Sequence, residues 1–191
     1  DARLEAAAHS ELTYLSFLAG LLEVEKTERQ RRSEETRIKL SRLPHQKTLE
    51  EFDFDFQPNI DRRQFKELST LSFAARSENV ILLGPPGVGK THLAIGLAVQ
   101  ALRSGMTVYF ASLTQLIADL KKAMISGRLD RRWRVYIRPD ILIVDEVGYS
   151  QLDREFVELM FHLVCSQYEK GSIILTSNRF FINWGEVMSD T

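Results

Sequence analysis

The sequence has a single cysteine, Cys165, and no long apolar run. One cysteine cannot close an intrachain disulfide, which excludes a disulfide-stabilised scaffold and fits a reducing compartment. No apolar run approaches the roughly 20 residues that span a bilayer, and the first residues do not form a basic-then-apolar signal peptide. We therefore expect a cytoplasmic protein with no membrane partner. Because the first residue is Asp1 rather than Met, we expect the natural start to lie upstream.

The sequence also lacks a charge imbalance, since the formal net charge is −1. A near-neutral chain has no global field to attract nucleic acid, so any such binding requires a local basic patch. Hydrophobic residues make up 44% of the chain and charged residues 27%, which is ordinary for a globular protein.

The first part of the chain predicts a helical N-terminal arm with an extended linker, residues 1–57. Leucines recur at helical spacing from residue 12 to residue 22, and we predict one helix over 10–43 that ends before Pro44. In "EFDFDFQPNI" phenylalanines alternate with acids, which predicts an extended segment with one apolar face. Asp61 is the expected cap of a further helix through about residue 76.

The second part, residues 58–191, alternates strands with helices. The predicted strands are "NVILLG" (79–84), "MTVYFAS" (106–112), "ILIVDE" (141–146) and "SIILTSN" (172–178). The predicted helices between them are 90–104, 113–124 and 153–169. Nearly continuous apolar strands separated by helices are typical of an α/β fold with a parallel sheet covered on both faces.

One loop carries a phosphate-binding motif. "GPPGVGKT" (84–91) fits G-x-x-x-x-G-K-[ST] and lies between a predicted strand and a predicted helix. Backbone N–H groups from Gly87 onward and the start of the helix favour phosphate oxygens. Lys90 is expected to neutralise the β- and γ-phosphates, and Thr91 to hold Mg²⁺. The alternative is a plain glycine-proline turn. The expected ATP-binding residues are Gly84, Pro85, Pro86, Gly87, Val88, Gly89, Lys90, Thr91 and His92, the last more typical of packing than of catalysis.

Polar residues end two further strands. Asp145 closes the strand 141–146 and is expected to orient Mg²⁺, while Glu146 suits a base that polarises water. Alone, such a pair could be a capping turn, but together with the phosphate loop it favours hydrolysis over phosphoryl transfer to a small molecule. At the end of the strand 172–178, Asn178 is the expected γ-phosphate sensor, with Ser177 and Thr176 as lesser candidates.

Two segments carry an excess of basic charge and are candidate DNA contacts. One runs along the arm and the other, with Trp133 interleaved, covers residues 121–134. The alternatives are solvated helix faces or, for the second segment, contact with a neighbouring subunit's nucleotide. The candidate residues are Arg29, Arg31, Arg32, Arg37, Lys39, Arg42, Lys121, Lys122, Arg128, Arg131, Arg132 and Arg134.

The order of "GPPGVGKTH", "RPDILIVDEVGY" and "TSNRFFINWGEV" resembles AAA+ ATPases of the IstB/DnaC group, and "LPHQKTLEEFDFDFQPNIDRRQ" resembles its IstB branch, the ATPase helpers of bacterial insertion-sequence transposases. The resemblance runs from about Leu12 to the end of the chain. It implies a P-loop NTPase (AAA+/ASCE) three-layer sandwich in which the strand 172–178 inserts between 79–84 and 141–146. It also implies a homo-oligomer on double-stranded DNA, in the bacterial cytoplasm, that assists the transposase of the same element.

The resemblance further implies a C-terminal strand and a helical lid, with an arginine finger, beyond Thr191. Without that strand the apolar strand 79–84 would be an exposed edge, so we expect the protein to continue. One departure, "GYSQLD" in place of a stiffer loop, affects no expected catalytic residue. Two alternatives stay open: a DnaC-type replicative helicase loader and a metabolic P-loop kinase.

Overall fold

The computed structural model describes residues 13–55, 57, 60–147 and 154–178, with side chains of the last range from residue 157. The chain forms two units, residues 1–36 and 37–191. Ile38, Leu49 and Phe54 of the second unit pack against its core.

The described part of the first unit is helical. Helix α2, Tyr14–Ser41, corresponds to the helix predicted over 10–43 and also enters the second unit. Leu15, Leu18 and Leu22 lie at helical spacing, but all three side chains are exposed. Arg31 is paired with Glu28 and Glu35 on the helix surface.

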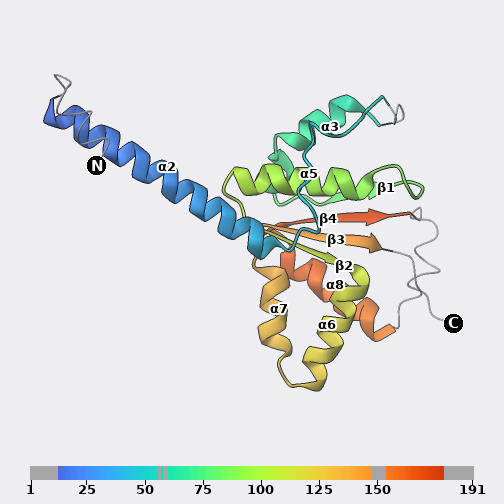
Figure 1. The fold of residues 1–191 in the computed structure, drawn as a ribbon. Helices are drawn as coiled ribbons and strands as arrows, with labels where there is room; N and C mark the ends of the chain where they lie inside the picture. The colour runs from blue at the N-terminus through green and yellow to red at the C-terminus, as the bar shows by residue number, and fades with distance from the viewer. Residues whose placement is uncertain (1–12, 56, 58–59, 148–153, 179–191) are drawn as a thin grey trace. The chain divides into compact units, whose positions relative to one another are not determined.

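A four-stranded sheet forms the centre of the second unit (Figure 1). The strands are β1 (Val80–Leu83), β2 (Val108–Ser112), β3 (Ile141–Val147) and β4 (Ser172–Ser177). All pairings are parallel and the spatial order is β1-β4-β3-β2. The predicted insertion of the last strand between the phosphate-loop strand and the acidic strand is therefore confirmed.

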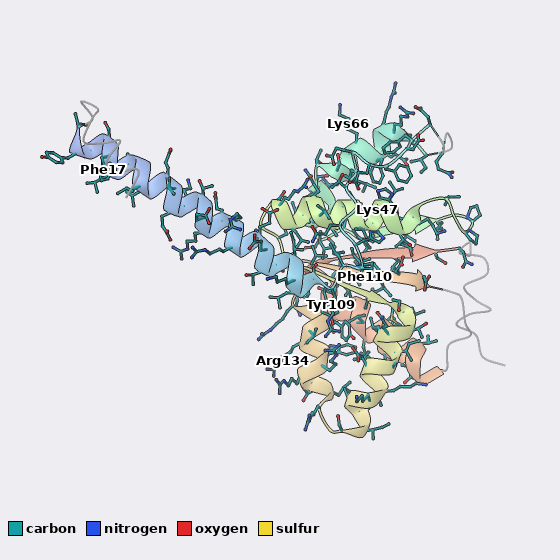
Figure 2. The ribbon with its side chains drawn as sticks, viewed as in Figure 1. Phe17, Lys47, Lys66, Tyr109, Phe110 and Arg134 are labelled. Carbon is teal, nitrogen blue, oxygen red and sulfur yellow. The ribbon has the colours of Figure 1, made fainter. Side chains whose placement is uncertain are left out.

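Helices cover both faces of this sheet (Figure 1), which confirms the three-layer α/β class. One face carries α3 (Arg62–Ser69), α4 (Ser72–Ala75) and α5 (Lys90–Arg103). The other carries α6 (Leu113–Ile125), α7 (Leu129–Ile137) and α8 (Arg154–Gln167). Successive strand residues point to opposite faces, so Phe110 joins the first core and Tyr109 the second (Figure 2).

The region between α2 and β1 differs from the prediction in two places. The helix expected over 61–76 is broken: Asp61 caps α3 as predicted, with Oδ1 accepting from the N–H of Arg63 at 2.7 Å, but Leu71 adopts a left-handed φ of 61° and separates α4. The phenylalanine segment is not extended, because Phe52 N–H donates to the Leu49 carbonyl (3.2 Å) in a turn. Phe56 lies outside the described residues.

The phenylalanine segment nevertheless buries an apolar face. The Phe52 and Phe54 rings meet edge to face at 4.8 Å, and Phe52 is 9% exposed. Two glycines of the α5 region give the segment room: a Cβ on Gly89 would lie 2.6 Å from the Phe52 ring, and one on Gly96 would lie 2.2 Å from Leu49. The segment is therefore pressed against the phosphate loop and α5.

Two further features of the helices concern the position of Cys165 and the length of the apolar stretches. Cys165 is exposed on α8, whose buried side chains among those described are Leu163 and Gln167. None of the helices in the described part of the chain is long and apolar enough to cross a membrane.

Candidate functional site

The carboxyl ends of β1, β3 and β4 meet around one cavity of about 310 Å³. Because these strands are parallel and adjacent, the loops that follow them open on the same edge of the sheet. The lining residues come from all three: Pro86, Gly87, Gly89, Lys90, Thr91, Glu146, Thr176, Ser177 and Asn178.

The phosphate-loop motif connects β1 to α5. Its first residue is tied to the neighbouring strand, since the Gly84 N–H donates to the Ser177 carbonyl at 3.2 Å. Gly89 precedes the first residue of α5 with a φ of 86°, a left-handed conformation that side chains rarely adopt. This turn directs the start of α5, with its free N–H groups, toward the cavity.

Lys90 is held in place by the loop itself. Its Nζ donates to the carbonyl oxygens of Gly84 and Pro85, both at 2.8 Å. Burial lowers the pKa of Lys90, while the nearby charge of Asp145 opposes that shift. A cation with part of its hydration removed is well suited to bind an anion at the cavity wall.

Thr91 and Asp145 form a second pair beside the cavity. The Thr91 hydroxyl lies 2.9 Å and 3.2 Å from the two Asp145 oxygens. Asp145 is only 6% exposed and also accepts a short hydrogen bond from the Thr176 hydroxyl. A hydroxyl and a carboxylate next to a phosphate loop are ligands that Mg²⁺ accepts when substrate phosphates supply the rest of its shell.

Glu146 is exposed and lines the cavity. Its φ of 63° is left-handed, which costs a non-glycine residue about 1–3 kcal/mol and is typical of functional sites. The β3–β4 register shifts at this point, between Val144 and Val147. The backbone N–H of Glu146 donates to the Thr176 hydroxyl at 3.0 Å.

Asn178 ends the described chain at the cavity wall. Its Oδ1 is buried, and it has no hydrogen-bond partner among the residues that the structure describes. Buried side-chain amides nearly always have partners in folded proteins. The position is therefore suited to a ligand or a bound water.

Four expected ATP-binding residues are not part of the cavity wall: Gly84, Pro85, Val88 and His92. Gly84 and Pro85 act through the carbonyls that accept from Lys90. His92 Nε2 donates to the Thr48 carbonyl at 2.9 Å, and its ring meets Phe52 edge to face at 5.3 Å. His92 thus links α5 to the phenylalanine segment.

The basic residues of the arm have varied surroundings. Arg29, Arg32 and Lys39 are exposed, whereas Arg31 is paired with two glutamates. Arg37 donates to the Leu102 carbonyl through Nε at 3.2 Å and Nη2 at 3.1 Å. The Arg42 guanidinium lies over the Tyr109 ring, 5.7 Å from its centre. Arg37 and Arg42 are thus engaged in packing the second unit.

Helices α6 and α7 form a hairpin that carries the second basic segment. Lys122, Arg128, Arg131 and Arg134 are exposed, Lys121 is half-buried, and Arg134 projects outward from α7 (Figure 2). A hollow of about 520 Å³ lies between the helices. Four basic residues line it: Lys122, Arg128, Arg131 and Arg132.

Arg132 has more partners within the protein than the exposed arginines of this segment. It is paired with Asp119 of α6, and its Nη2 donates to the hydroxyls of Tyr109 at 3.3 Å and Tyr136 at 3.4 Å. Burial would lower the pKa of Arg132, but the hydrogen bond to Asp119 and the other partners raise it overall. The guanidinium therefore joins the two helices.

Sequence reasoning underrated two residues. Thr176 was only a lesser sensor candidate, yet its hydroxyl contacts both acidic positions. The sequence feature that could have indicated this role is a β-branched polar residue within an apolar strand. Arg138, exposed one turn beyond Arg134, lies outside the basic segment that we delimited. The sequence feature that could have identified Arg138 is its spacing from Arg131 and Arg134, which places all three on one helix face.

Comparison with known proteins agrees with this geometry. The profile of one family, described as "IstB-like ATP binding protein", matches residues 1–191. The chain is 52% identical over 190 residues to the insertion sequence IS21 putative ATP-binding protein of Pseudomonas aeruginosa, covering 100% of this chain and 72% of that protein. It is 45% identical over 191 residues to the IS5376 putative ATP-binding protein of Geobacillus stearothermophilus, covering 100% of this chain and 76% of that one.

Solved structures show the same fold. The replication initiator DnaA bound to AMPPCP and single-stranded DNA superimposes with a TM-score of 0.61 at 22% identity, over 72% of this chain and 43% of that one. The DnaC helicase loader superimposes with a TM-score of 0.53 at 25% identity, over 67% of this chain and 77% of that one.

Proposed function

The chain belongs to the family of IstB-like ATP-binding proteins, and from this premise we propose that the cavity beside Lys90 is its ATP·Mg²⁺ site. The observation that carries the proposal is the meeting of three groups at one cavity. These are the Lys90 ammonium, the paired Thr91 and Asp145 oxygens, and the Asn178 amide with its buried Oδ1. Each suits a different part of a bound triphosphate.

Every group has a distinct role in this proposal. Backbone N–H groups from Gly87 to Lys90 and the start of α5 receive the phosphates. Lys90 leaves the loop carbonyls and binds the β- and γ-phosphates. Thr91 and Asp145 hold Mg²⁺, which when bound neutralises the phosphate charge. Asn178 hydrogen-bonds the γ-phosphate or the attacking water.

We further propose that the site hydrolyses ATP. Glu146 is exposed at the cavity, whereas Asp145 is buried and already hydrogen-bonded, so the two carboxylates have different surroundings. The exposed one is free to accept a proton from water, and the buried one is positioned for the metal. Positioning and charge stabilisation supply most of the catalysis in such sites.

The biological setting that we propose is assembly on double-stranded DNA in support of a transposase. Its support is twofold: the relatives are named ATP-binding proteins of insertion sequences, and the hairpin exposes Lys122, Arg128, Arg131 and Arg134. Exposed cations that can approach phosphates give sequence-independent, salt-sensitive binding. A homo-oligomer would place several such hairpins along one duplex.

The experiment measures assembly and phosphate release together. We expect the protein, taken at its natural length, to oligomerise on duplex DNA with a non-hydrolysable ATP analogue, and duplex DNA to stimulate release of free phosphate. Preference for single strands together with binding of a replicative helicase would instead support a loader, to which the likeness to DnaC points. Phosphate transfer to a small acceptor would indicate a kinase.

A further inference from the structure

We propose that Thr176 is a positioning residue, whose single hydroxyl fixes both acidic residues of the site by completing a bulge in β3. The inference rests on the roles proposed above for Asp145 and Glu146. It assigns a function to a strand residue that contacts the proposed metal ligand and lies beside the proposed base.

The bulge follows from the strand register. Val144 is opposite Leu175 and Val147 is opposite Ser177. Between these pairs β3 advances three residues while β4 advances two. Asp145 and Glu146 together therefore face Thr176 alone, which is the arrangement of a β-bulge.

A bulge leaves backbone groups without their ladder partners. The residue affected here is Glu146, which adopts the left-handed φ of 63°. Its N–H donates to the Thr176 side chain at 3.0 Å instead of to a strand carbonyl. Thr176 thus replaces the missing ladder bond and stabilises the turn that sends Glu146 into the cavity.

The same hydroxyl also donates a hydrogen bond to the Asp145 carboxylate. A hydroxyl has one proton to give, and that of Thr176 is directed to Asp145 Oδ1, while its lone pair accepts from Glu146. Asp145 also accepts from Thr91. Because Thr176 is 1% exposed, bulk water cannot easily replace its hydroxyl.

The bulge is held at its other end by the next residue of β4. The Ser177 hydroxyl donates to the Val147 carbonyl at 2.6 Å. Two consecutive side chains of β4 therefore hold the irregular part of β3, and Asn178 follows immediately. We infer that β4 aligns the base, the metal ligand and the sensor as one rigid group.

The test compares side chains of similar shape with and without the hydroxyl. Thr176→Val keeps the shape and removes the hydroxyl, whereas Thr176→Ser keeps the hydroxyl. We expect Val to lower kcat about 10- to 100-fold, as small misplacements of catalytic groups do. The ATP dissociation constant should change less than about threefold, because Lys90 and the loop are untouched, and Ser should stay near wild type.

The chain offers a matched control at the opposite end of the sheet. The Thr107 hydroxyl donates to Asp140 Oδ2 at 2.8 Å and accepts from the Asp140 N–H at 3.0 Å. Thr107→Val therefore removes a similar pair of bonds far from the cavity. We expect it to change thermal stability but not kcat.

The remaining outcomes separate the two proposals. In a Glu146→Gln background, Thr176→Val should lower the residual rate less than it does in the wild-type background, because part of its effect acts through Glu146. If Thr176→Val turns over at the wild-type rate while Glu146→Gln does not, the inference is wrong and the site assignment stands. If Glu146→Gln itself hydrolyses normally, the proposed function fails. Should the Val variant not fold, Thr176→Ala against Thr176→Ser repeats the comparison.

Discussion

The cavity edge and the α6–α7 hairpin present polar groups in opposite ways. At the cavity, Lys90, Thr91 and Asp145 are all hydrogen-bonded to protein groups and partly or fully buried. On the hairpin, Arg128 and Arg131 are exposed and form no ion pair within the described residues. A preorganised site can bind one ligand in one geometry, whereas exposed cations attract any polyanion and are screened by salt.

The hairpin contains the same contrast within two adjacent residues. Arg131 is exposed, while Arg132 is paired with Asp119 and contacts two tyrosine hydroxyls. Their chemistry is identical, so only their positions on α7 separate a candidate DNA contact from a structural residue.

The largest effect is expected at the phosphate loop. Among the described residues that line the cavity, Lys90 is the only one with a cationic side chain. We expect Lys90→Ala to lower ATP affinity at least about 100-fold, since hydrogen bonds to charged groups contribute about 1.5–3 kcal/mol each. Isothermal titration with ATP and Mg²⁺ measures it. Lys122→Ala, an exposed lysine on the hairpin, is the control, and an unchanged affinity for Lys90→Ala would remove the loop from the site.

A smaller effect is expected when Arg132 is removed. Arg132→Ala leaves Asp119 without its ion-pair partner, and we expect the free energy of unfolding to fall by about 2 kcal/mol. Arg131→Ala should change it by less than about 0.5 kcal/mol, as exposed substitutions usually do. Urea unfolding of both variants gives the comparison. Equal stability for the two would mean that Arg132 is not a structural residue.

DNA binding, unlike stability, should depend on the exposed arginines of the hairpin. Replacing Arg128 and Arg131 together by glutamine should weaken duplex binding about tenfold and lower the salt slope by about 2, if each contacts one phosphate. Fluorescence anisotropy at several salt concentrations measures both quantities, and ATP affinity serves as the control. An unchanged slope would exclude these two arginines from the DNA interface.

The smallest effect concerns pH. Burial alone would raise the pKa of Asp119, but hydrogen bonds from Tyr136 and Arg132 and the charge of Arg132 lower it below the ordinary value of 3.8. A lowered folded-state pKa gives stability that is present above about pH 4 and lost as the pH falls through the folded value. We expect Asp119→Asn to reduce this acid dependence, as followed by thermal unfolding between pH 3 and pH 6. The same slope in both proteins would contradict the assignment.

Sequence reasoning could identify the cavity because its chemistry is carried by motifs. The glycine-rich loop, the acidic pair and the asparagine each end a strand, and parallel strands bring their carboxyl ends to one edge. The strand order followed from the resemblance to a known fold. These features depend on local spacing and topology, which the sequence records directly.

Other features depend on contacts that no local pattern records. Leu71, whose left-handed φ breaks the predicted helix, is buried in the core, and the turn at Phe52 places its ring against His92 of α5. The pairing of Arg132 with Asp119 joins residues of two helices. The bulge that pairs Thr176 with both acids requires the β3–β4 register. Tertiary packing settles such details, and composition or periodicity cannot.

The central claim is that the cavity at the ends of β1, β3 and β4 binds ATP and that Glu146 activates the attacking water. Its most direct test is phosphate release by Glu146→Gln at saturating ATP and Mg²⁺, with bound ATP measured in the same samples. We predict that the rate falls by about 10²- to 10⁴-fold, the usual contribution of a general base, while ATP affinity stays within about threefold. Turnover at the wild-type rate with ATP bound normally would contradict the account.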